Sequence, residues 1–139
     1  MKVYIAKNCG FCSGVRKAVD TAFSVPAENT YILGELIHNE DVNARIRERG
    51  IPTVESLAEV PDGARLLIRS HGVPKAVYAR CEARGIKVID CTCKFVANSQ
   101  HIVERESKAG KVIAITGHRE HPEVVGLIGW SEGEVYVFS

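Results

Sequence analysis

The chain has 139 residues, of which 18 are Lys or Arg and 17 are Asp or Glu, so its formal net charge is +1. This balance argues against an electrostatic clamp for nucleic acid. A hydrophobic content of 45% and a charged content of 25% argue against disorder. No apolar run approaches the roughly 18 residues that a membrane span needs, and the N-terminus lacks the pattern of a secretory signal. We therefore expect one small cytoplasmic domain, or two very small ones.

The predicted elements alternate between strands and helices along the chain. Strands are expected at 2–6, 30–33, 64–70, 86–90 and 111–116 and in the closing EVYVFS, and helices at 14–25, 40–49, 74–85, 95–109 and from Pro122. Asn39 can cap the second helix, and Gly50 can end it. The run 111–116 is apolar throughout, which is typical of a buried parallel strand. This order predicts an α/β fold with mostly parallel sheets and flanking helices.

Cysteine and histidine provide most of the reactive side chains. Eight of the ten follow directly after a predicted strand: Cys9, Cys12, His38, His71, Cys91, Cys93, His118 and His121. Because the carboxyl ends of parallel strands meet at one edge of a sheet, we expect these side chains to gather on one rim. Cys81 and His101 fall inside predicted helices, and Cys81 is most simply a core residue.

The cysteines favour metal binding or thiol chemistry. Their number is odd and no export signal accompanies them, which makes a disulfide framework a poor explanation. Cys12 precedes a predicted helix, and a helix N-terminus favours the thiolate that ligates metal. Cys9, Cys12, Cys91 and Cys93 could form a closed four-sulfur site, and the CxxC pair Cys9–Cys12 could instead be a redox dithiol. Structural cysteines at strand ends are the remaining alternative.

The histidine loops suit an anionic ligand. His38 and His71 each end a strand, and the stretch 117–123 contains His118, His121 and Glu123 just before a helix. Imidazoles beside helix N-termini can bind an anion such as a diphosphate, and the glutamate could relay protons. The alternative for 117–123 is a solvated polar loop.

Five motifs carry a resemblance to a known family. In order, GFCSGV, GELIHN, RSHGV, a DxTC ending at Cys93 and GHxxHPEVxG resemble motifs of the LytB/IspH family of 4-hydroxy-3-methylbut-2-enyl diphosphate reductases. The resemblance spans essentially the whole chain and implies the N-terminal half of a three-lobed α/β fold. It places an N-terminal strand and cluster loop at 1–13, a first α/β lobe at 14–92 and part of a second lobe at 93–139.

The resemblance also implies an iron–sulfur enzyme of non-mevalonate isoprenoid biosynthesis. Such an enzyme reductively removes the hydroxyl group of an allylic diphosphate to give isopentenyl and dimethylallyl diphosphates, with electrons from a donor such as ferredoxin or flavodoxin. It implies the following site residues: Cys12 and Cys93 as two of three ligands of a [4Fe–4S] cluster, His38, His71 and His121 around the diphosphate, and Glu123 as the proton donor. Cationic imidazoles would balance the charge of the substrate.

This sequence departs from the family pattern in several places. The family's third cysteine ligand and a later Ser/Thr/Asn group that holds the diphosphate have no counterpart here. Lys94-Phe95 stands where the family has Pro and an apolar residue, and Cys9 and Cys91 are additional. The strand at 2–6 would join a third lobe that this sequence lacks. We therefore expect a reductase site that is incomplete without a C-terminal half.

Overall fold

The computed structural model describes residues 1–7 and 9–139. The helices are α1 (Ser13–Ser24), α2 (Glu40–Glu48), α3 (Lys75–Ala83), α4 (Lys94–Lys108) and α5 (Pro122–Trp130), with a short 3-10 turn at Leu57–Glu59. The strands are β1 (Thr30–Leu33), β2 (Thr53–Val54), β3 (Arg65–Ile68), β4 (Lys87–Asp90), β5 (Ile113–Thr116) and β6 (Val135–Phe138). The helices and strands predicted after residue 13 are confirmed, with ends that differ by a few residues. None of the described helices is long and apolar enough to cross a membrane.

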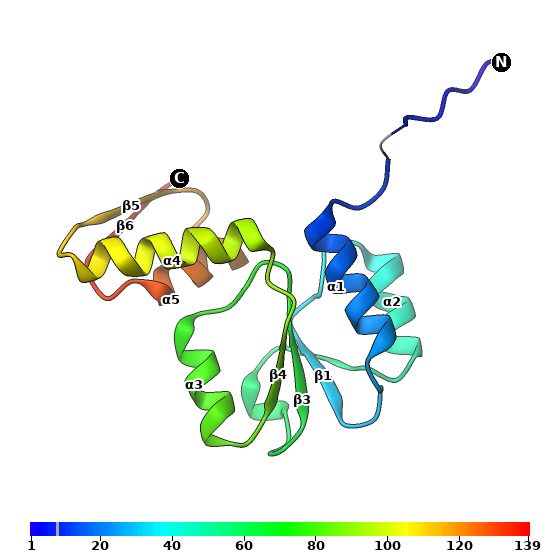
Figure 1. Ribbon diagram of the computed structural model, residues 1–139, viewed down its shortest axis with the longest axis horizontal. Helices are drawn as coiled ribbons and strands as arrows, with labels where there is room; N and C mark the ends of the chain where they lie inside the picture. The colour runs from blue at the N-terminus through cyan, green and yellow to red at the C-terminus, as the bar shows by residue number, and fades with distance from the viewer. Residues whose placement is uncertain (8) are drawn as a thin grey trace.

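Two parallel sheets organise the chain. The larger sheet has the strand order β2-β1-β3-β4, and the smaller sheet pairs β5 with β6. All four strand pairs are parallel, which confirms the predicted α/β class. In Figure 1, α1 and α2 lie on one side of the larger sheet and α3 lies on the other, while α4 and α5 accompany the smaller sheet.

The larger sheet separates two hydrophobic cores. Leu67 of β3 packs with the α1 and α2 side, whereas its neighbours Leu66 and Ile68 pack with the α3 side. This alternation follows from the two-residue period of a strand. Cys81 is fully buried in the α3 core, as predicted. Cys91, at the end of β4, is 1% exposed and belongs to the other core.

The predicted strand at 2–6 is wrong for this structure. Residues 1–6 form neither helix nor strand, and the side chains of Val3, Tyr4 and Ile5 are exposed. Figure 1 shows this segment leading away from the rest of the molecule. An isolated strand has no partner for its backbone hydrogen bonds, so an apolar pattern alone does not form one. Asn8 lies outside the described residues.

The expectation of full burial for 111–116 is also wrong. Ile115 is buried, but Ala114 and Thr116 are exposed. The reason is the size of the smaller sheet, in which β5 has β6 as its hydrogen-bonded neighbour and leaves one face open. The predicted boundary between 92 and 93 falls in the junction between β4 and α4, and the division into lobes stays a prediction.

Candidate active site

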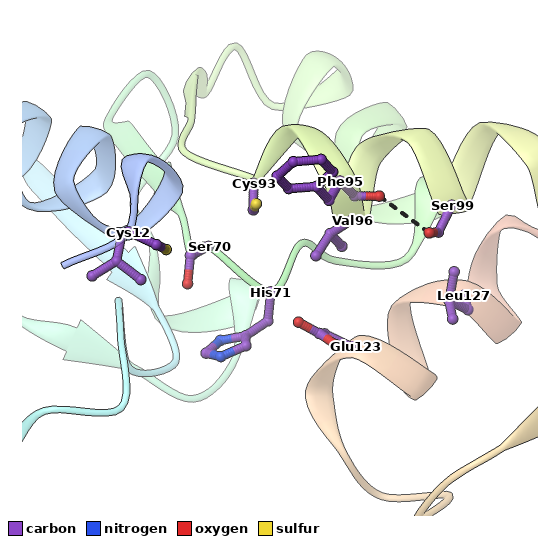
Figure 2. A pocket seen from close by; sticks show the side chains of 10 residues that line it. Cys12, Ser70, His71, Cys93, Phe95, Val96, Ser99, Glu123 and Leu127 are labelled. Atoms are coloured by element: carbon purple, nitrogen blue, oxygen red, sulfur yellow. Dashed lines mark hydrogen bonds between the residues drawn. The ribbon is translucent and has the colours of Figure 1, made fainter. Parts of the chain in front are cut away.

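A cavity of about 390 Å³ lies where the N-termini of α1, α4 and α5 approach the turn that follows β3. It is lined by Cys12, Val15, Ser70, His71, Cys93, Phe95, Val96, Ser99, Glu123 and Leu127. Figure 2 shows Cys12, His71, Cys93 and Glu123 entering this space from four separate segments. The cavity therefore combines four residues that the sequence singled out.

Three of the predicted site residues are helix N-caps. Cys12 caps α1, Cys93 caps α4 and His121 caps α5. The unpaired N–H groups and the macrodipole make a helix N-terminus a favourable place for negative charge. Three such ends around one site suit thiolates and an anionic ligand.

The two cysteine loops lie against each other. A methyl group at Gly14, in the first turn of α1, would lie 2.8 Å from Cys93 Sγ. Because real Cβ contacts are longer than this, a glycine at position 14 lets α1 approach Cys93 closely. The thiols of Cys12 and Cys93 are both free and both line the cavity.

The turn at residues 70–73 is held by contacts from three directions. The Ser70 N–H and hydroxyl both donate to the Leu36 main-chain oxygen, at 3.2 and 3.3 Å. The Cys93 N–H donates to the Ser70 oxygen at 2.9 Å. The Trp130 indole donates to the Val73 oxygen at 3.0 Å. This turn therefore fixes His71 relative to the loop after β1, to α4 and to α5.

His38, His71 and His121 form a cluster beside the cavity. The ring centroids of His38 and His71 are 4.3 Å apart, and His121 lies 6.2 Å from the first and 6.1 Å from the second. Burial, followed by the charges of His38, Arg69 and His121, lowers the pKa of His71 to about 4. His71 is therefore neutral near pH 7 when no ligand is bound.

The start of α5 joins the histidine cluster to the carboxylate. The Glu123 N–H donates to His121 Nδ1 at 3.3 Å, so the ring proton of a neutral His121 resides on Nε2. The Glu123 side chain is only partly buried and lines the cavity. In Figure 2 it extends toward the space beside His71. The carboxylate can therefore exchange protons with a ligand bound there.

Not all of the predicted rim residues join this site. Cys91 packs in the core, where burial raises the pKa of its thiol, and His118 is exposed on the loop after β5. Cys9 lines a neighbouring hollow that it shares with Cys12. Among residues 1–7 and 9–139, no group of three or more Cys, His, Asp or Glu side chains is arranged to hold a metal ion. The four cysteines Cys9, Cys12, Cys91 and Cys93 are thus not grouped as a closed four-sulfur site in the described part of the chain, and the dithiol hypothesis stays a prediction.

Sequence reasoning missed the wall of the cavity. Phe95, Val96 and Ser99 come from the first two turns of α4, and Leu127 comes from α5. The spacing of 95, 96 and 99 is that of one helix face and could have indicated this surface. The partner of that face could not be read from the pattern.

These features define an α/β protein in which two thiols, three imidazoles and a carboxylate gather at helix N-termini and in the loops that follow strands. The family model described as LytB protein matches residues 3–139, and the chain belongs to this family. This confirms the resemblance carried by the five sequence motifs.

Relatives and solved structures agree with this assignment. The chain is 44% identical, over 99% of its length, to a 4-hydroxy-3-methylbut-2-enyl diphosphate reductase of Alkaliphilus oremlandii, and 41% identical to one of Caldanaerobacter subterraneus. It covers 50% of each. A solved structure of such a reductase, titled the terminal enzyme of the non-mevalonate pathway, matches with a TM-score of 0.82 and 32% identity over 99% of this chain and 50% of its own. The Plasmodium falciparum reductase matches with a TM-score of 0.89 and 26% identity over 94% of this chain and 42% of its own. The chain spans about half the length of the curated relatives that it matches.

Proposed function

We propose that this chain contributes half of the active site of a 4-hydroxy-3-methylbut-2-enyl diphosphate reductase. The reaction adds two electrons and two protons to the allylic diphosphate, breaks its C–O bond, and yields water with isopentenyl or dimethylallyl diphosphate. One observation carries the proposal: Cys12, Cys93, His71 and Glu123, from four segments, line one cavity. The remaining groups would come from the region that the relatives have and this chain does not span.

The two thiols fit a cluster in part. Both are free, both cap helices and both reach the same cavity, as suits thiolate ligands. A [4Fe–4S] cluster held there would supply the electrons and an open metal position. Cys12 and Cys93 are the two described thiols that line this cavity, so the cluster would need at least one further ligand. Electrons would come from a donor of the ferredoxin or flavodoxin type.

The histidines would hold the diphosphate. The His121 ring can offer its Nε2 proton as a hydrogen-bond donor, because its Nδ1 accepts the Glu123 N–H. His38 and His71 lie within 6.2 Å of it by ring centroids and provide further imidazole groups. A bound diphosphate would favour protonation of His71, which is neutral in the free protein.

Glu123 would deliver a proton to the departing hydroxyl group. Its carboxylate lines the same cavity as the thiols, at the side of His71. A carboxyl group in this place can protonate the oxygen as the C–O bond breaks, so that water leaves rather than hydroxide.

Anaerobic reconstitution with iron and sulfide tests the cluster part of the proposal. Cys12→Ser and Cys93→Ser should each lower the iron and sulfide bound per chain, because each removes a thiolate. Cys9→Ser is the matched control, since this exposed cysteine lies outside the cavity. Unchanged iron in the first two variants, or equal loss in all three, would contradict the assignment.

The catalytic part needs the chain combined with the C-terminal half of a relative. Glu123→Gln should keep the bound iron and lower kcat by roughly 10²-fold, as expected for loss of a general acid. Equal turnover of the variant and the parent would rule out Glu123 as the proton donor.

A further inference from the structure

Gln100 is a buried amide in the middle of α4 that the proposed chemistry does not use. Its side chain is 1% exposed, and its Nε2 has no hydrogen-bond partner among the described residues. Buried polar side chains are usually paired, so an unpaired amide in the interior needs an explanation. The explanation lies in the two backbones that it contacts.

The Gln100 amide lies close to two glycines, one in the turn that holds His71 and one in α5. A methyl group at Gly72 would lie 2.4 Å from Gln100 Nε2, and one at Gly126 would lie 3.1 Å from the same atom. Gly72 follows His71 directly in the turn after β3, and its φ of +72° is a conformation that favours glycine. Gly126 lies three residues after Glu123, on the same face of α5.

The same contacts bring the turn and the helix together. A methyl group at Gly126 would also lie 3.7 Å from the His71 main-chain oxygen. The backbone around His71, the Gln100 amide and the first turns of α5 thus meet in one packed layer.

We propose that Gln100 is a positioning residue that sets the separation of the His71 turn from α5, and thereby of His71 from Glu123. This role rests on the proposed function, because it matters for catalysis only if these two residues act on one ligand. The role depends on the length of the Gln100 side chain rather than on a hydrogen bond, since Nε2 has no partner among the described residues. Methionine, which has similar length and no amide, should therefore replace Gln100, whereas alanine should not.

Amide hydrogen exchange in the 139-residue chain tests the proposal without any ligand. The Gly72 N–H donates to the Arg69 oxygen at 3.0 Å, and the Val125 N–H donates to the His121 oxygen at 2.9 Å. Gln100→Ala should speed exchange at both amides about tenfold and leave the Ile32 amide of the larger sheet unchanged. Gln100→Met should restore both rates. Ile102→Ala, on the exposed face of α4, is the control.

Affinity for inorganic diphosphate provides the second readout. Gln100→Ala should weaken binding several-fold, and Gln100→Met should bind like the parent. Equal acceleration of exchange at Gly72, Val125 and Ile32, or no acceleration at the first two, would overturn the positioning role. If the parent chain binds no diphosphate, the three histidines alone do not hold that ligand, while the exchange pattern still decides the role of Gln100.

One variant keeps the test decisive if Gln100→Ala does not fold. Gly126→Ala adds a methyl group 3.1 Å from Gln100 Nε2, and alanine is favourable inside a helix. If Gln100 transmits a displacement from α5 to the turn, Gly126→Ala should change the rate of amide exchange at Gly72, which lies against the same side-chain amide. An unchanged Gly72 rate would overturn the proposal.

Discussion

The indole Nε1 of Trp130 donates a hydrogen bond to the main-chain oxygen of Val73 at 3.0 Å. This bond joins the last residue of α5 to the turn that holds His71. His101 packs edge-on against the same indole, with 5.1 Å between ring centroids. The junction between the two sheets thus has a specific polar contact within an aromatic cluster.

Trp130→Phe should isolate the contribution of that hydrogen bond. Phenylalanine keeps an aromatic ring and leaves the Val73 oxygen without the indole donor. We expect the free energy of unfolding to fall by about 1 kcal/mol, the usual net value of one hydrogen bond. Urea unfolding followed by circular dichroism measures the change, and an unaltered midpoint would contradict it. His101→Ala is the control for loss of ring packing alone.

His71 should make the protein sensitive to mild acid. Its pKa is lowered to about 4 in the folded state, chiefly by burial, and is near 6.5 when unfolded. Between these values the unfolded state binds more protons, so stability is complete above about pH 6.5 and falls as the pH drops toward 4. The difference between the two pKa values corresponds to roughly 3 kcal/mol. Urea unfolding at several pH values checks this, and His71→Asn should lose that part of the pH dependence.

Gly14→Ala should reverse the usual effect of alanine in a helix. Alanine normally stabilises a helix by about 1 kcal/mol relative to glycine. Here the added methyl group would lie 2.8 Å from Cys93 Sγ, so we expect a net loss of roughly 1–3 kcal/mol and poorer iron loading. Thermal unfolding and iron content measure both effects. Combining Gly14→Ala with Cys93→Ala removes the contact with Sγ but keeps one of 3.2 Å with Cβ, so part of the stability should return. No recovery at all would show that the contact with Sγ is not responsible.

Glu104 should contribute a salt-dependent part of the stability. Its carboxylate accepts hydrogen bonds from Lys108 and Lys75, which lower its pKa to about 2. The same two lysines also reach Glu132, at 3.4 and 3.3 Å, so the network links α3, α4 and the end of α5. Because the folded pKa is lowered, this contribution is present above about pH 4.5 and is lost as the pH falls toward 2. Glu104→Gln should lower the urea midpoint slightly in dilute buffer.

High salt provides the control for the Glu104 prediction. In about 1 M NaCl the Debye length shrinks to about 3 Å, so the parent and the variant should become similar. A difference that persists unchanged in high salt would point to packing rather than charge.

Local patterns were enough to predict most of this fold. Helix caps such as Asn39, and stops such as Gly50, lie in the predicted positions because short-range chemistry fixes them. The burial of Cys91 could not be predicted, because only the folded structure shows that its side chain belongs to the core. The predictions of a buried strand at 111–116 and of a strand at 2–6 were wrong for a related reason. Burial and strand pairing both depend on neighbouring segments, which the periodicity of one segment does not describe.

The candidate site was likewise predictable in part: the sequence indicates which residues converge, but not their burial or protonation. Strand ends predicted that Cys12, His71, Cys93 and the loop of Glu123 would converge, and all four line one cavity. The neutral state of His71 depends on burial and on three surrounding charges, which the sequence cannot rank. The contact of Gln100 with Gly72 and Gly126 could be seen only in the folded structure, since nothing in the sequence of α4 marks that glutamine as different from a surface residue.

The parallel arrangement of both sheets has a consequence for how fast the chain folds. Thr30 pairs with Arg65, Arg65 pairs with Lys87, and Ile113 pairs with Val135, so every ladder closes only after an intervening crossover is in place. Such long-range closures lose loop entropy before contacts repay it. The chain should therefore refold more slowly than a helical bundle of equal length, and the large sheet should form before α4 and α5 have a surface to pack against.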